Sequence, residues 1–272
     1  GLILLRPHHE LYGQYCRQIN AIYAQYTDLV EAASVDESYL DVTGSRALFG
    51  TGEQIANELR ARVKRETGLT ISVGVSFNKI FAKLGSDYKK PDAITRIERD
   101  NYKELVYPLP AADLLYVGPA TERKLRGVGI YTIGQLAEAS PELLEYRLGK
   151  MGLVLHTFAN GLDVSPVQRS DHIRAIKSVG NSATTPRDLV SDDDVRLMLY
   201  LLAESVACRM RELASKCTVV EVTVRDTELH WYCRQKKLAV PTCSSAEIAE
   251  VAFDLFRRSY SWIAPIRSIG VR

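Results

Sequence analysis

Two adjacent acidic residues, Asp36 and Glu37, are the residues of this sequence best placed to do chemistry. They stand between two short runs of small or β-prone residues, 30–35 and 38–42. We therefore expect a hairpin with both carboxylates at its apex, because only a turn or bulge lets neighbouring side chains converge on one point. Glu is unfavourable in a tight two-residue turn, so the pair favours a divalent-metal site. A solvated acidic turn is the alternative at this stage.

The segments around the acidic pair predict an α/β layer. The expected order is a helix over 9–25, the hairpin, a helix over 52–67, a strand over 69–76, a helix over 80–89 and a strand over 93–97. Ser76 or Asn78 is expected to cap the helix over 80–89. Strands and helices that alternate in this way place the acidic turn at one end of a sheet.

Short helices joined by glycine turns are expected from residue 101 onward. Residues 114–125 and 128–136 each follow a pattern of helix, tight turn and helix, with Gly118 and Gly129 in the turns. This pattern is typical of helix-hairpin-helix elements. Such a turn exposes backbone amides that hold a phosphate without reading a base.

The last part of the chain predicts a third domain after a linker at 165–170. The expected elements are a strand (177–187), a helix (192–213), strands (217–225 and 228–238), a helix (245–259) and a strand from 266. A βαββαβ order is the ferredoxin-like arrangement. The whole chain is thus predicted to be an α+β multidomain protein.

Composition and charge narrow the function classes. The chain has 272 residues, 46% hydrophobic and 25% charged, which is ordinary for a globular protein of two or three domains. It has no apolar run of eighteen residues, so no membrane partner is expected. Its five cysteines form no Cys-x-x-Cys pair, which favours reduced thiols and a cytoplasmic location over disulfides or a zinc site.

Basic residues cluster in the second half of the chain, although the net charge is only +2. The clusters lie at 123–126, 169–177, 234–237 and 257–258. One such cluster is more often a solvated face, but four in one region indicate a phosphate backbone as the partner.

Four motifs in order make the chain resemble the Y-family, or lesion-bypass, DNA polymerases, with the bacterial DinB or polymerase IV branch as the nearest match. The motifs are residues 33–41, 72–83, 86–92 and 177–180. The resemblance spans essentially the whole chain and implies three domains. These are a partial α/β palm with the catalytic site (1–100), a helix-hairpin-helix thumb (101–165) and a ferredoxin-like, DNA-binding little finger (166–272).

The resemblance implies a DNA-directed DNA polymerase, a nucleotidyltransferase that adds deoxynucleotides to a primer 3′-OH on damaged template by a two-metal mechanism. Asp36 and Glu37 would be the catalytic ligands of two Mg²⁺ ions, and Lys90 would hold the incoming triphosphate. A helix-terminal lysine that offsets the helix dipole is the alternative for Lys90. The expected partners are primer-template DNA and deoxynucleoside triphosphates for a monomeric protein, and a sliding clamp is a further candidate. The predicted DNA contacts are Gly118, Gly129, Lys177, Arg234, Lys236, Lys237, Arg267 and Arg272.

The sequence also departs from the family pattern. The family begins with a palm strand that carries another metal-binding aspartate, followed by a fingers domain, and neither precedes Gly1. Tyr116 replaces the first glycine of the first thumb hairpin. We therefore expect these residues to bind DNA but to be catalytically incomplete. A non-catalytic DNA-binding or adaptor protein is the alternative, and the sequence upstream of Gly1 would distinguish the two.

Overall fold

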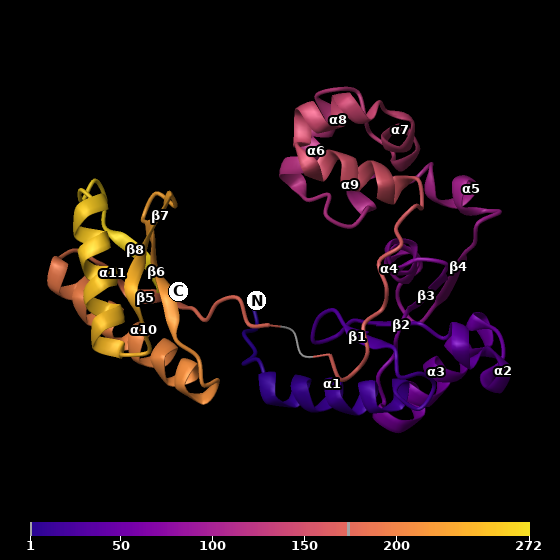
Figure 1. Ribbon diagram of the computed structural model, residues 1–272, viewed down its shortest axis with the longest axis horizontal. Helices are drawn as coiled ribbons and strands as arrows, with labels where there is room; N and C mark the ends of the chain where they lie inside the picture. The colour runs from indigo at the N-terminus through magenta and orange to yellow at the C-terminus, as the bar shows by residue number, and fades with distance from the viewer. Residues whose placement is uncertain (1, 173–174) are drawn as a thin grey trace. The chain divides into compact units, whose positions relative to one another are not determined.

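The computed structural model describes residues 2–172 and 175–272, and the chain divides into two compact units, Gly1–His172 and Ile173–Arg272 (Figure 1). The predicted boundaries at 100 and 165 both fall within the first unit and stay predictions. Two residues of the basic cluster at 169–177, residues 173 and 174, lie outside the described residues. No helix in the described ranges is long and apolar enough to cross a membrane.

The acidic pair lies in the predicted hairpin. Helix α1 (His9–Tyr23) is followed by the antiparallel strands β1 (Val30–Ala32) and β2 (Ser38–Leu40). Both strands are shorter than predicted, because the amides of Ala33 and Ser34 turn back to the carbonyl oxygen of Glu37, at 2.9 and 3.2 Å. A five-residue loop, 33–37, therefore replaces a tight two-residue turn.

Helix α3 (Gly52–Thr67) supports the hairpin from one side and has the predicted bounds; the short α2 (Arg46–Phe49) precedes it. Thr51 and Gln54 form a capping box that fixes where α3 begins. The buried stripe of α3 is Ile55, Leu59 and Val63, which packs with α1. This small core fixes the base of the hairpin.

Helix α4 (Lys79–Tyr88) packs closely on the parallel strands β3 (Val73–Ser76) and β4 (Ile94–Ile97). Asn78 is the observed N-cap, and its side-chain oxygen accepts from the amide of Phe81 at 2.8 Å. Gly74 makes the close packing possible, because a Cβ built there would lie 1.8 Å from the carbonyl oxygen of Ala82. The position of α4 thus depends on a glycine in β3.

The predicted single sheet is not present in the described residues. The strands form two separate two-stranded sheets, β1-β2 and β3-β4. Strands of three and four residues offer few backbone pairs, and side chains of α4 join the two sheets instead, through the ion pairs of Lys79 with Glu31 and of Lys83 with Glu37.

Residues 101–160 form the predicted cluster of short helices (Figure 1). They are α5 (Tyr102–Val106), the 3-10 turn η2 (Ala111–Asp113), α6 (Pro119–Arg126), α7 (Ile133–Glu138), α8 (Pro141–Leu148) and α9 (Lys150–Ala159). The first predicted hairpin is wrong in one respect, because only η2 and a turn precede α6. Tyr116 lies in that turn with φ of +71°, a conformation that favours glycine.

The second unit has the predicted βαββαβ order. Its elements are β5 (Asn181–Leu189), α10 (Asp192–Glu212), β6 (Cys217–Asp226), β7 (Trp231–Thr242), α11 (Ser245–Ser259) and β8 (Ile266–Val271). The sheet order β5-β8-β6-β7 is entirely antiparallel and puts the second and fourth strands in the centre. A ferredoxin-like sheet has the first and third strands there, so the ferredoxin-like prediction is right in chain order and differs in strand order.

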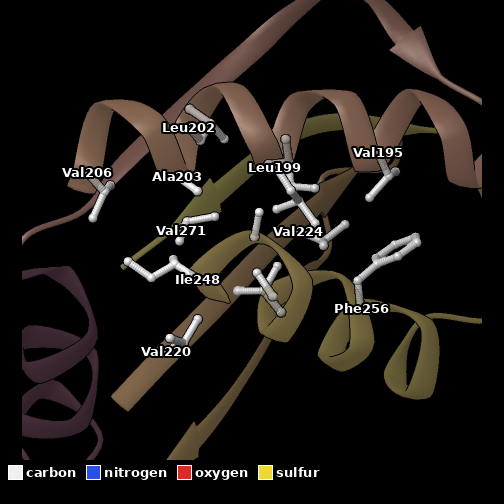
Figure 2. Packing of buried hydrophobic residues seen from close by; sticks show 14 of the residues in the cluster. Val195, Leu199, Leu202, Ala203, Val206, Val220, Val224, Ile248, Phe256 and Val271 are labelled. Carbon is white, nitrogen blue, oxygen red and sulfur yellow. The ribbon is translucent and has the colours of Figure 1, made fainter. Parts of the chain in front are cut away.

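One face of this sheet is covered by α10 and α11. Figure 2 shows Leu199 and Ala203 of α10 and Phe256 of α11 packed with strand residues such as Val224. Strand alternation puts residues such as Arg225 on the opposite face, which neither α10 nor α11 covers. Each edge strand contains a proline, Pro186 in β5 and Pro241 in β7, which limits further strand pairing. We call the uncovered side the open face.

Candidate active site

The acidic pair and Lys90 line one cleft in the first unit. The cleft has a volume of about 720 Å³, and its wall includes the hairpin loop, β3, the lysine-bearing side of α4 and residues 163–167. Asp36 and Glu37 enter from the loop, and Lys90 enters from the chain just after α4. The structure brings these three residues to one cleft, and their predicted roles stay predictions.

The hairpin loop orients the two carboxylates differently. The Ser34 hydroxyl donates to Oδ1 of Asp36 at 2.6 Å and accepts from the Asp36 amide at 3.4 Å, so Ser34 shapes the turn. Asp36 lies exposed at the loop surface. Oε1 of Glu37 instead accepts from Nζ of Lys83 at 2.5 Å. The sequence reasoning missed Lys83 as a partner of the acidic pair.

Lys83 and Lys90 are linked through one carboxylate. Asp87 holds Nζ of Lys83 through Oδ2 at 2.8 Å and Nζ of Lys90 through Oδ1 at 2.6 Å. Burial opposes ionisation of Asp87, but the two lysines outweigh burial and lower its pKa. Burial also opposes the charge on Lys83, yet hydrogen bonds to Asp87 and Glu37 raise its pKa. A row of alternating charges, Glu37, Lys83, Asp87 and Lys90, therefore connects the hairpin loop to the chain after α4, and Glu37, Lys83 and Lys90 of this row line the cleft.

A second lysine of α4 holds the other end of the hairpin. Nζ of Lys79 lies 2.5 Å from Oε2 of Glu31, and both side chains are only 14% exposed. The same oxygen accepts from the amide of Gln168 at 2.9 Å. The Lys79 ammonium also lies 5.5 Å from the centre of the Tyr39 ring. Lys79 and Lys83 are four residues apart and face the same direction, a helical spacing visible in the sequence.

The described residues offer few carboxylates for metal binding. Across 2–172 and 175–272, no group of three or more His, Cys, Asp or Glu residues is placed to hold a metal ion. Two carboxylate side chains suit a magnesium ion, which commonly keeps several waters and binds substrate phosphates as well. Asp36 and Glu37 are the oxygen donors of this kind at the hairpin loop.

The two thumb glycines differ in their backbone amides. The Gly129 amide donates to the Arg126 carbonyl oxygen at 3.1 Å, and the amides of Tyr131 and Thr132 donate to the Gln135 side chain. At the start of α6, the amide of Gly118 donates to no other group within the described part of the chain. A built Cβ at Gly118 meets nothing within 4 Å, so its backbone is open to approach. The predicted phosphate contact is therefore better supported at Gly118 than at Gly129.

The basic residues predicted to contact DNA divide between several positions on the second unit. Lys177 lies before β5 rather than within it, which corrects the predicted strand start. Nζ of Lys236 lies 3.9 Å from Asp254 of α11, so Lys236 and Arg234 belong to the helix-covered side of β7. Lys237 lies on the open face by strand alternation.

The two predicted arginines of the last strand region are paired with acids. Arg267 lies 3.3 Å from Asp188, and Arg272 lies 3.1 Å from Glu221. The sequence reasoning missed Arg225, whose guanidinium lies 5.1 Å from the centre of the Trp231 ring on the open face. The register partners Arg225 and Trp231 thus form a cation–π pair there.

Comparison with known proteins identifies the family of the chain. Residues 1–87 match the model of the impB/mucB/samB family, and residues 176–272 match the model of that family's C-terminal domain. DNA polymerase IV of Acetivibrio thermocellus is 47% identical over 272 residues, which cover all of this chain and 68% of the relative. DNA polymerase IV of Pelotomaculum thermopropionicum is 35% identical over 99% of this chain and 67% of the relative.

Solved structures show the same fold. A Y-family DNA polymerase chimera of Dbh and Dpo4 covers 97% of this chain and 76% of its own, with a TM-score of 0.83 and 24% identity. DinB from Sulfolobus solfataricus covers 99% of this chain and 78% of its own, with a TM-score of 0.56 and 24% identity. The DNA polymerase IV relatives and the family match define a nucleotidyltransferase of the DNA-directed DNA polymerase class. Within that class, the chain belongs to the impB/mucB/samB family, as a DinB-like member of the Y-family polymerases.

Proposed function

We propose that this protein performs translesion DNA synthesis by adding deoxynucleotides to a primer 3′-OH at the cleft between the hairpin loop and α4. The observation that carries the proposal is that Asp36, Glu37 and Lys90 line the same cleft. Two carboxylates and an ammonium in one cleft suit a metal-bound triphosphate, because phosphoryl transfer depends on positioning and charge neutralisation.

Asp36 and Glu37 would hold magnesium, which when bound neutralises charge on the phosphate oxygens at the primer end. Asp36 is exposed and already turned by the Ser34 hydroxyl, so its second oxygen is accessible to an ion. Glu37 reaches an ion by exchanging its contact with Lys83. Two carboxylates support one magnesium ion directly, and a second ion needs donors beyond those at the hairpin loop.

Lys90 would bind the triphosphate of the incoming nucleotide. Its side chain is 55% exposed and is anchored by Asp87 at 2.6 Å, so the ammonium stays near the cleft wall yet remains accessible. A helix-end lysine that only offsets the dipole would not need to line the cleft. The cleft position therefore favours the nucleotide-binding role.

The DNA duplex would be held through its phosphates. The amide of Gly118 at the start of α6 and the basic side chains of the second unit give contacts that do not depend on base sequence. Lys237 and the Arg225–Trp231 pair make the open face the preferred surface for this contact. Sequence-independent binding suits an enzyme that acts wherever template is damaged.

We also propose that residues 1–272 alone bind primer-template DNA but do not extend it. The cleft has two carboxylates at the hairpin loop, and no third one joins them in the described ranges. The relative from Acetivibrio thermocellus has further sequence, because this chain matches 68% of its length. A third metal ligand and further contacts to the triphosphate would come from such additional sequence.

Primer extension by the full-length protein tests the proposal. Asp36→Ala and Glu37→Ala should each abolish nucleotide incorporation while the circular dichroism spectrum stays unchanged, because the lost interaction acts in the transition state. Lys90→Ala should mainly raise the KM for the nucleotide. Glu142→Ala, an exposed acid in the first turn of α8, is the matched control and should extend normally.

Three outcomes would contradict the assignment. Near-normal extension by Asp36→Ala would show that the acidic pair is not part of the active site. Full activity in the presence of a chelator would show that no metal ion is needed. DNA binding without any incorporation by the full-length wild-type protein would favour the non-catalytic adaptor instead. Primer extension by a polypeptide of residues 1–272 would show that two carboxylates are sufficient.

A further inference from the structure

The row of alternating charges in the cleft connects the two ends of the proposed site. Lys83 lies in the middle of the row, with Nζ 2.5 Å from Glu37 and 2.8 Å from Asp87. Its side chain is 20% exposed, whereas those of Glu37, Asp87 and Lys90 are 41%, 44% and 55% exposed. The least exposed member of the row is thus the one that links the proposed metal ligand to the proposed nucleotide ligand.

We propose that Lys83 is a positioning residue that balances metal binding against nucleotide binding in this cleft. Its ammonium forms an ion pair with Glu37 when no metal is bound. It also shares Asp87 with Lys90, so Asp87 does not fully neutralise the Lys90 ammonium, which can then bind the triphosphate. The inference rests on the proposed function, because it concerns the same cleft. Lys83 itself need not touch the substrate.

Competition for Glu37 is the first part of the argument. An ammonium at 2.5 Å takes the place that a cation would occupy at Oε1. A metal ion at Oε1 must displace this ammonium, and Asp87 can retain it, since Asp87 already holds Lys83 at 2.8 Å. A metal ion at Oε2 would lie beside the ammonium and be repelled by it. Removing the ammonium should therefore make metal binding to the free protein tighter, because the competing cation is lost.

The sharing of Asp87 is the second part. Each carboxylate oxygen of Asp87 holds one lysine, so its charge is divided between Lys83 and Lys90. The two acids and two lysines of the row cancel in charge. Without Lys83 the row has a net negative charge, and Asp87 pairs with Lys90 alone. Both changes weaken the attraction of the cleft for the negatively charged triphosphate. Nucleotide binding should therefore become weaker.

Loss of the Lys83 charge should thus tighten metal binding and weaken nucleotide binding. A purely structural role would not change the two affinities in opposite directions. Lys83→Met keeps most of the apolar stem and removes the charge. The Kd for Mn²⁺ is measured on the full-length protein without DNA or nucleotide, from the electron paramagnetic resonance signal of unbound Mn²⁺. We expect this Kd to fall about fivefold, which corresponds to the loss of one partly exposed ion pair. In primer extension, the KM for the nucleotide should rise about fivefold, with a smaller change in kcat.

Two further variants make the result specific. Lys83→Arg keeps the charge and should keep both constants near the wild-type values. Lys79→Met removes the same charge one turn earlier on α4, where the partner is Glu31 rather than Glu37. It should not tighten Mn²⁺ binding to the same degree, because it frees no ligand of the proposed metal site.

The outcomes separate this inference from the proposed function. Unchanged or weaker Mn²⁺ binding by Lys83→Met, or an unchanged nucleotide KM, would overturn the role of Lys83. Equal tightening by Lys79→Met would overturn it too, since the effect would then be one of general charge. If Glu37→Gln binds Mn²⁺ as well as the wild type does, the metal assignment itself fails. If Glu37→Gln loses Mn²⁺ binding and Lys83→Met matches the wild type, only the role of Lys83 fails.

Discussion

The contact between β3 and α4 provides the sharpest prediction about how the fold positions the site. A methyl group at Gly74 would lie 1.8 Å from the Ala82 carbonyl oxygen and 2.6 Å from the Ser86 amide nitrogen. Both are backbone atoms of α4, so no side chain can rotate away. Gly74→Ala must therefore move the helix that carries Lys79 and Lys83.

The size of this movement follows from the contact distances. The built methyl is about 1.6 Å short of the 3.4 Å at which ordinary contact begins, so α4 must shift by roughly 1 Å or more. Overpacking of this kind costs about 1–3 kcal/mol, and a backbone clash belongs at the upper end of that range. A misplacement of about 1 Å at a catalytic site lowers the rate by about 10²-fold. We expect Gly74→Ala to lose about 3 kcal/mol of unfolding free energy in the first unit and about 10²-fold in kcat/KM.

Separate probes for the two units make the measurement clean. Both tryptophans, Trp231 and Trp262, lie in the second unit, so tryptophan fluorescence during urea unfolding should be unchanged by Gly74→Ala. Hydrogen exchange of α4 amides should report the lost stability, and primer extension by the full-length protein should report the lost rate. The control is Gly44→Ala, where the added Cβ meets nothing within 4 Å. Wild-type exchange rates in α4 of Gly74→Ala would refute the role assigned to this glycine.

Three further predictions concern the second unit. Replacing Lys236 and Lys237 together with Ala should weaken binding to unrelated duplexes equally. The slope of the logarithm of the binding constant against the logarithm of the salt concentration should become shallower by up to about one per lost phosphate contact, and a loss that depends on DNA sequence would contradict this. Phe256→Ala, at a side chain 1% exposed, should lower the unfolding free energy by about 3–5 kcal/mol in urea titrations followed by fluorescence, and a change below 1 kcal/mol would show that the core closes over the cavity. Burial opposes ionisation of Asp226, but the His230 amide and ring outweigh it and lower the pKa, so this unit should lose stability as the pH falls below the ordinary value of 3.8. Asp226→Asn should flatten that part of the stability–pH curve, and an unchanged curve would exclude Asp226 as its source.

Local signals predicted most of the elements. Asn78 was one of the two predicted caps, and α4 begins directly after it. The hairpin strands were predicted too long, since the backbone turn at Glu37 depends on how loop amides pair rather than on β-propensity. The order of strands in the second unit was also beyond sequence reasoning, because two strands separated by a helix can lie on either side of a third.

The charges of the cleft were harder to predict than its fold. Residue types and turn chemistry pointed to Asp36 and Glu37, and the resemblance added Lys90. The sequence gives no direct sign that Glu37 and Lys83, which are 46 positions apart, form an ion pair. A partial signal was present, because Lys79, Lys83 and Asp87 repeat every four residues along α4. On an isolated helix that stripe indicates only a solvated face with one favourable pair.

The stripe becomes part of the site because the hairpin supplies its counter-charges. Glu31 lies in β1 and Glu37 at the end of the loop, and the two lysines of α4 contact one each. This match requires α4 to lie close to β3, which Gly74 permits, and requires the loop to turn at Glu37. An acidic hairpin, a glycine in a strand and a lysine stripe on a helix are each weak signals alone. Their combined geometry is the basis of the proposal that metal and nucleotide binding in this cleft depend on each other.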